Sequence, residues 1–73
     1  MEVKVLKKGI KGAEVKAMQL LLIGYGFSCG EKGADGSFGA ATDKALKAYQ
    51  KSRGLGQDGV CGPITWASLL GIS

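Results

Sequence analysis

Apolar residues recur at helical spacing in three stretches of the chain. In the first stretch, Val15, Met18 and Leu22 stand at intervals of three and four residues, which predicts a helix over residues 13–25. Gly26 is its expected C-terminal cap, because glycine enters the left-handed conformation without a steric cost. The neighbouring apolar positions of this helix are Leu21 and Tyr25.

The second stretch has its own apolar stripe and its own cap. Ala45, Leu46 and Tyr49 form the buried stripe of a helix that we predict over residues 40–53. Its first turn is acidic and its last turn is basic, as the helix dipole prefers. Gly54 is then the expected cap, and the leucine after it is expected to fold back onto the last turn.

The third stretch is shorter and begins at the single proline. Pro63 suits the first helical position, where its missing N–H is not needed, and Gly71 ends the helix. Its expected apolar face consists of Trp66, Leu69 and Leu70. Near the start of the chain, Val3 and Val5 alternate with charged residues, as in a short extended segment. These patterns predict an all-α fold, a compact three-helix domain with glycine-rich turns.

A twelve-residue phrase occurs twice, as DGSFGAATDKAL at residues 35–46 and as DGVCGPITWASL at residues 58–69. Within each copy the aspartate can accept backbone N–H bonds in an Asx-type turn, and the glycine after it supplies a positive φ. We interpret the phrase as a fold device, a turn–helix internal repeat, and expect Gln50 to tie loops by hydrogen bonds to the backbone. The residues assigned to the turns are Asp35, Gly36, Gly39, Asp58, Gly59 and Gly62.

The order and spacing of these motifs resemble the peptidoglycan-binding domain of bacterial cell-wall hydrolases. That family has the patterns G-x-x-G-x-x-V-x-x-L-Q, D-G-x-F-G-x-x-T-x-x-A-V-x-x-F-Q-x-x-x-G-L and D-G-x-x-G-x-x-T-W-x-x-L. The chain follows them over residues 6–71, in GIKGAEVKAMQLLLIGYGFSCG, GADGSFGAATDKALKAYQKSRGL and QDGVCGPITWASLLG. Phe27 stands where the family usually has tyrosine, and Tyr49 stands where it usually has phenylalanine.

The resemblance implies a domain organisation and a role. Residues 6–73 would form the peptidoglycan-binding domain, and residues 1–5 an N-terminal extension or linker. Such a domain usually sits beside an amidase, lysozyme-like, transglycosylase or peptidase domain and holds that enzyme on the wall. The implied location is extracellular and cell-wall associated.

The residues that most catalytic sites need are scarce in this sequence. A chain of 73 residues allows one domain, and it contains no histidine and only two cysteines. The commonest general base and the usual zinc ligands are therefore missing, so we expect no cofactor and no metal site. Asp35 and Asp58 occupy identical turn contexts, so nothing separates their pKa values as a glycosidase pair requires. We therefore predict a binding module without catalytic activity of its own.

The net charge of +4 favours an anionic partner. Lys44, Lys47 and Lys51 share one face of the second predicted helix, which is either a solvated face or a contact to carboxylates of the stem peptide or to anionic wall polymers. A small basic helical domain that binds nucleic acid is the alternative function. Against it, no helix places Arg, Asn or Gln in a row suited to base edges. The longest apolar run, at residues 20–23, is too short to span a bilayer. We expect a monomer with neither a nucleic-acid nor a membrane partner.

Peptidoglycan stem peptides carry free carboxylates and short aliphatic side chains, which a shallow groove with aromatic walls and a basic rim can hold. We expect aromatic side chains to form the walls and basic side chains near the end of the second helix to form the rim. An acidic side chain can meet an amino group of the ligand. The candidate ligand-binding residues are Phe27, Tyr49, Lys51, Arg53, Asp58 and Trp66.

The two cysteines leave several interpretations open. Cys61 takes the place of Phe38 in the internal repeat, which predicts an inward-facing and inert thiol. An exported protein could instead pair Cys29 with Cys61, and we favour two unpaired buried thiols. A similar fold occurs in the propeptide of matrix metalloproteinases, but a thiol acting on a metal would have to be exposed.

Overall fold

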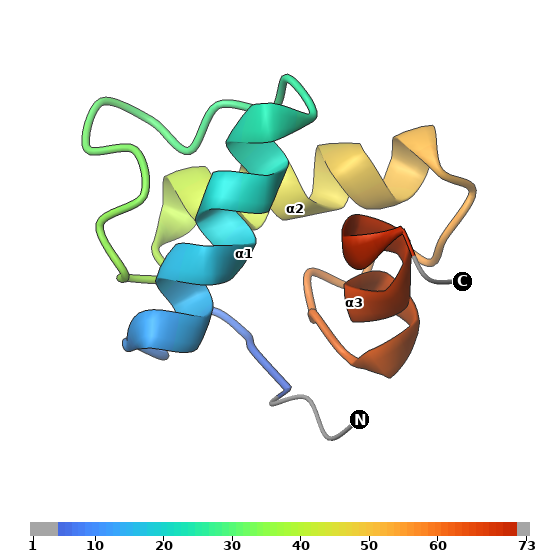
Figure 1. Cartoon of the computed structure of the whole chain (residues 1–73), viewed down its shortest axis with the longest axis horizontal. Helices are drawn as coiled ribbons and strands as arrows, with labels where there is room; N and C mark the ends of the chain where they lie inside the picture. The colour runs from blue at the N-terminus through green and yellow to red at the C-terminus, as the bar shows by residue number, and fades with distance from the viewer. Residues whose placement is uncertain (1–4, 72–73) are drawn as a thin grey trace.

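The computed structural model describes residues 5–71, which form three helices and no strand (Figure 1). The helices are α1 (Ala13–Gly24), α2 (Ala40–Ser52) and α3 (Pro63–Leu70). The all-α class, the three helices and the proline start of α3 are thus confirmed, while α1 and α2 end one residue earlier than predicted. Residues 1–4, which include Val3 and most of the predicted extension, and residues 72–73 lie outside the described residues.

The glycine caps confirm the predicted helix ends. Gly26, after α1, has φ 95°, and Gly54, after α2, has φ 70°. The Leu55 N–H donates to the Gln50 carbonyl (2.8 Å), so the leucine closes the last turn of α2 in a Schellman arrangement. Gly71 adopts the left-handed conformation at the end of α3. The sequence therefore sets where each helix stops by placing glycine where other residues would be strained.

Replacing Gly54 with valine is expected to lower the free energy of unfolding by about 1–2 kcal/mol, because a β-branched side chain fits a positive φ poorly. No atom lies within 4 Å of the position that a Cβ on Gly54 would take, so the cost comes from the backbone alone. Gly56→Val is the matched control, because Gly56 has no positive φ and equally open surroundings. Equal thermal melts for the two variants would contradict this account of the cap.

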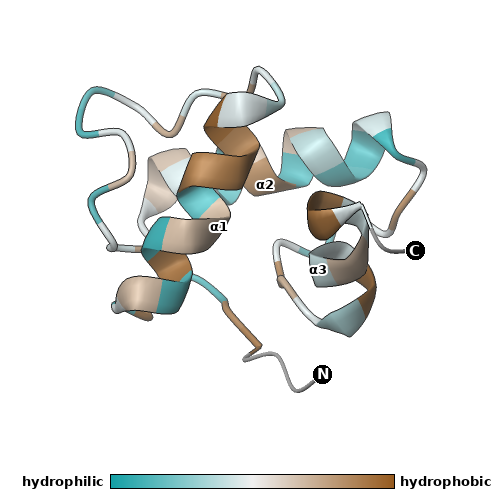
Figure 2. Cartoon of the chain, in the orientation of Figure 1, coloured by the Kyte–Doolittle hydropathy of each residue, from teal (hydrophilic) through white to brown (hydrophobic). Residues whose placement is uncertain are grey.

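The core lies where the three helices meet the turns between them. The predicted stripes of α1 and α2 are buried, but Leu70 of α3 is 42% exposed, against the prediction. Successive helical residues point about 100° apart, so only Leu69 of the adjacent pair can face inward. Apolar colour is concentrated in the last turns of α1 and in α3 (Figure 2). The fully buried apolar side chains are Leu6, Val15, Met18, Leu22, Phe38, Leu46, Tyr49, Cys61 and Leu69.

A buried glutamine ties α1 to the turn that precedes α2. The side-chain nitrogen of Gln19 donates to Asp35 Oδ1 (3.1 Å), the Ser37 carbonyl (3.0 Å) and Thr42 Oγ1 (2.9 Å). Its side-chain oxygen accepts the Gly36 N–H at 2.8 Å. All polar groups of this amide are thereby satisfied in a site without solvent access.

The second half of the chain repeats this arrangement contact by contact. The side-chain nitrogen of Gln50 donates to Asp58 Oδ1 (3.0 Å), the Val60 carbonyl (3.0 Å) and Thr65 Oγ1 (3.3 Å). Its side-chain oxygen accepts the Gly59 N–H at 3.2 Å. The loop-tying role predicted for Gln50 is confirmed, and the repeated phrase is a duplicated hydrogen-bond network. We call these two networks, each with its flanking helices, the first and second units.

Candidate ligand-binding site

An arginine at the end of α2 lies over two tyrosine rings. The guanidinium carbon of Arg53 is 5.0 Å from the ring centroid of Tyr25 and 5.4 Å from that of Tyr49. Arg53 is exposed, and the one ion pair among residues 5–71 joins two other side chains, Lys47 and Asp43. The rings therefore orient a guanidinium whose hydrogen-bond donors are free to meet a planar anion such as a carboxylate.

Three aromatic rings support this arginine. Tyr49 packs edge-to-face on Phe27 (5.7 Å between ring centroids) and tilted against Tyr25 (5.4 Å). The Tyr25 hydroxyl donates to the Leu69 carbonyl (2.8 Å), and the Tyr49 hydroxyl is 2.7 Å from Ser68 Oγ, so both tyrosines hold α3. We call the set Tyr25, Phe27, Tyr49 and Arg53 the arginine cluster.

The structure places the predicted ligand-binding residues at different depths. Tyr49 is fully buried and Trp66 is 6% exposed, so both pack in the core and a ligand would meet them only through their neighbours. Phe27 is half-buried, whereas Lys51, Arg53 and Asp58 are exposed. Tyr25, which is 40% exposed, offers the aromatic surface here and is not among the residues predicted from the sequence. That these predicted residues bind a ligand stays a prediction.

The two turn aspartates do the same structural work, as predicted. Asp35 Oδ1 accepts the Ser37 N–H (2.9 Å), and Asp58 Oδ1 accepts the Val60 N–H (2.9 Å). These backbone hydrogen bonds, with those from the glutamines, lower the pKa of both carboxyl groups below the usual range. Both aspartates are therefore ionised at neutral pH and are shifted in the same direction, which is unlike a catalytic acid–base pair.

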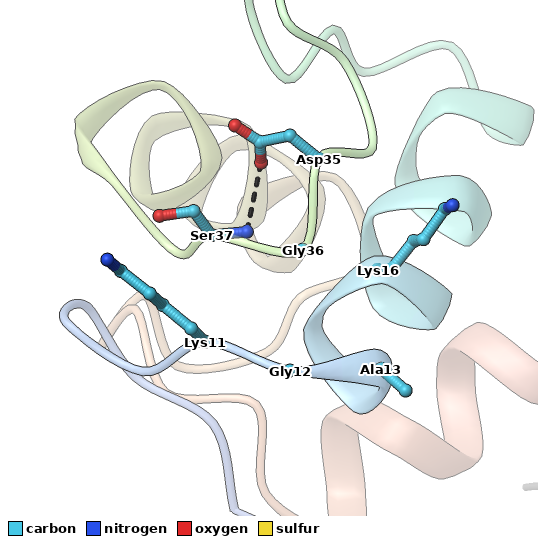
Figure 3. Close-up of a pocket in the computed structure, with 7 residues that line it drawn as sticks. All are labelled: Lys11, Gly12, Ala13, Lys16, Asp35, Gly36 and Ser37. Atoms are coloured by element: carbon cyan, nitrogen blue, oxygen red, sulfur yellow. Dashed lines mark hydrogen bonds between the residues drawn. The ribbon is translucent and has the colours of Figure 1, made fainter.

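A shallow cleft of about 390 Å³ lies beside the start of α1. Figure 3 shows the Lys11 and Lys16 side chains extending on either side of the turn that contains Asp35 and Gly36. Neither lysine is among the site residues predicted from the sequence, because only the folded chain brings residues 11–16 against residues 35–37. The lining residues are Lys11, Gly12, Ala13, Lys16, Asp35, Gly36 and Ser37.

Both cysteines are unpaired and buried, which confirms the prediction made for them. Cys61 has no exposed surface, and burial raises the pKa of its thiol from the ordinary 9.0 to about 12. Cys29 is 4% exposed, and burial also raises its pKa. Neither cysteine therefore offers the exposed thiolate that an inhibitor acting on a metal would need.

Within residues 5–71 no three His, Cys, Asp or Glu side chains gather closely enough to hold a metal ion. None of the helices in this part of the chain has the length and apolar character needed to cross a membrane.

The fold and its surface features define a small helical binding domain built from two turn–helix units. Residues 11–69 match the family described as "Putative peptidoglycan binding domain", and the chain belongs to that family.

Two of the sequence relatives of the chain are much longer enzymes. The chain is 48% identical over 68 residues to the N-acetylmuramoyl-L-alanine amidase CwlL of Bacillus licheniformis, covering 93% of this chain and 19% of the amidase. It is 36% identical over 61 residues to the zinc D-Ala-D-Ala carboxypeptidase of Streptomyces albus G, covering 84% of this chain and 24% of that enzyme. The chain therefore spans between about a fifth and a quarter of the length of these relatives.

Solved structures show the same fold. The N-terminal domain of SleB matches with a TM-score of 0.88 and 34% identity, over 96% of this chain and 93% of that domain. The endolysin of Burkholderia phage AP3 matches with a TM-score of 0.84 and 38% identity, over 93% of this chain and 25% of the endolysin. The resemblance stated from the sequence is thereby confirmed.

Proposed function

We propose that this domain anchors a linked cell-wall hydrolase to peptidoglycan and has no catalytic activity of its own. The observation that carries the proposal is the family match over residues 11–69, together with relatives in which the same domain makes up about a fifth of a wall-degrading enzyme. We further propose an extracellular, wall-associated location and a monomeric domain, with peptidoglycan rather than nucleic acid or a membrane as its partner.

The stem peptide is the part of peptidoglycan that the arginine cluster suits. Arg53 presents an oriented guanidinium, Tyr25 offers a partly exposed aromatic side chain, and Lys51 and Asp58 supply further charges at the surface. A carboxylate would meet Arg53 in a two-pronged hydrogen bond, and an aliphatic side chain would lie against the tyrosine. A domain this small offers little contact area, so we expect dissociation constants on the order of tens of micromolar or weaker.

The test is co-sedimentation with purified peptidoglycan at about 0.15 M salt, where screening weakens non-specific attraction. We expect the domain in the pellet, stem peptide as a better competitor than bare glycan, and about tenfold weaker binding for Arg53→Ala. Lys44→Ala is the matched control, since it removes one exposed cation from the same helix. If the domain stays in the supernatant, it does not bind peptidoglycan. If it clears a cell-wall suspension, it has catalytic activity of its own. If Arg53→Ala sediments as well as wild type, the arginine cluster is not the binding site.

A further inference from the structure

The two units differ at the start of their first helix. Gln19 lies seven residues after Gly12, the N-cap of α1, whereas Gln50 lies eleven residues after Gly39, the N-cap of α2. Four additional residues make about one helical turn. The first turn of α2 therefore has no helical counterpart in α1.

In the second unit, that additional turn places the Asp43 side chain over the Asp-Gly turn, beside Lys47 of the following turn. Asp43 Oδ1 lies 2.6 Å, and Lys47 Cε 2.9 Å, from the position that a Cβ on Gly59 would take. Lys47 Nζ pairs with Asp43 Oδ2 at 3.1 Å. A carboxylate paired with a lysine ammonium thus covers Gly59.

In the first unit, Gly12 and Lys16 take the places of Asp43 and Lys47 when the glutamines are aligned. The nearest atoms to the position of a Cβ on Gly36 are the Gly12 carbonyl oxygen (3.3 Å) and Lys16 Cβ (3.9 Å). Because Gly12 has no side chain, no carboxylate of this unit covers Gly36 as Asp43 covers Gly59, and the 390 Å³ cleft lies beside the Gly12 backbone (Figure 3). No ion pair joins Lys16 to a carboxylate of residues 5–71.

We propose that this cleft, between Lys11 and Lys16 and over Gly36, binds a carboxylate of a peptidoglycan stem peptide. The ligand carboxylate would pair with Lys16, as the Asp43 carboxylate pairs with Lys47 in the second unit. The inference rests on the proposed function but concerns a separate site. The cleft is at the start of α1 and the arginine cluster is at its end, about 18 Å away along a twelve-residue helix.

The acidic groups around the cleft restrict which ligands it takes. Asp35 lines the cleft, and the hydrogen bonds it accepts from the Ser37 N–H and the Gln19 side chain keep it ionised. Glu14 lies at the margin, with Oε1 3.3 Å from the position of a Cβ on Gly12. Two carboxylates beside two lysines disfavour a polyanion and favour a ligand that carries a carboxylate with an ammonium group nearby. A second contact point on each domain would also strengthen attachment to a wall that presents many stem peptides.

The experiment titrates the ¹⁵N-labelled domain with a synthetic stem tetrapeptide that has free carboxylates, with the same peptide amidated, and with inorganic phosphate. We expect the free peptide to shift the amide resonances of residues 11–16 and 35–37. The amidated peptide should bind about tenfold more weakly, because it cannot accept charge-assisted hydrogen bonds from the lysines. The Lys11→Ala/Lys16→Ala variant should bind the free peptide about tenfold more weakly than wild type does. Inorganic phosphate should not shift the resonances of residues 11–16 and 35–37.

The matched control is Lys44→Ala/Lys47→Ala, which removes the same charge and includes the second-unit counterpart of Lys16; we expect its affinity to stay within about twofold of wild type. If the two double variants lose the same affinity for the peptide, general charge attraction explains the binding and the cleft is not the site. Equal shifts with phosphate would overturn the stem-peptide assignment. If wild type sediments with peptidoglycan and the Lys11→Ala/Lys16→Ala variant sediments and titrates as wild type does, only the assignment of the cleft as a binding site is wrong. If wild type does not sediment, the proposed function itself is wrong.

Discussion

Replacing Gln50 with alanine is expected to lower the free energy of unfolding by about 3 kcal/mol or more, which is a large share of the stability of so small a domain. The amide makes four hydrogen bonds in a site that is 1% exposed. Its removal leaves the Gly59 N–H and the Thr65 hydroxyl without this partner, and each buried group left unsatisfied costs about 1–3 kcal/mol. Urea unfolding followed by circular dichroism measures the loss.

The duplication supplies a second form of the same test. Gln19→Ala should cost as much as Gln50→Ala, because Gln19 makes the same four contacts in the first unit. Gln57→Ala, at an exposed loop position, should change stability by less than about 0.5 kcal/mol. A loss below about 1 kcal/mol for either buried glutamine would show that the network does not carry the fold.

In the folded domain, Cys61 is expected to react with a thiol reagent about a thousandfold more slowly than a cysteine with an ordinary pKa. Its pKa of about 12, against the ordinary 9.0, lowers the thiolate fraction at pH 8 by about that factor. Burial of the sulfur slows access further. A Cys29→Ala variant isolates the signal of Cys61, and the absorbance of a released aromatic thiol reports the rate.

The same variant in concentrated guanidinium provides the reference, because unfolding exposes the thiol and returns its pKa to the ordinary range. We expect the rate in the folded state to rise with pH throughout the range of folded protein, since the thiolate is a minor species below pH 12. Labelling of the folded domain as fast as of the unfolded chain would contradict the buried position of Cys61.

Local rules explain what the sequence predicted correctly. The caps at Gly26, Gly54 and Gly71 follow from the conformational freedom of glycine, and the stripes of α1 and α2 follow from helical spacing. The prediction that Leu70 faces the core was wrong, because spacing alone does not show which of two adjacent leucines is buried. The aspartate turns were predictable because their hydrogen bonds join residues only two positions apart.

The candidate sites depend on contacts that no local rule contains. Tyr25 and Arg53 stack because the ends of α1 and α2 meet, and the two residues are far apart in the sequence. Lys16 and Gly36 become neighbours only when the Gly12 N–H donates to the Gly36 carbonyl (2.9 Å). Gln19 had a usable signal, since it precedes an Asp-Gly pair as Gln50 does, but the longer intervening loop hides the correspondence.

Helix α2 belongs to both units, as the last helix of the first and the opening helix of the second. Neither unit can therefore fold as an autonomous half, and a cut within α2 would destroy both. A further unit stacked in the same way would need a glutamine on α3 to receive the next Asp-Gly turn. The eight residues of α3, PITWASLL, contain none. α3 therefore lacks the side chain on which another copy of the glutamine network would be built.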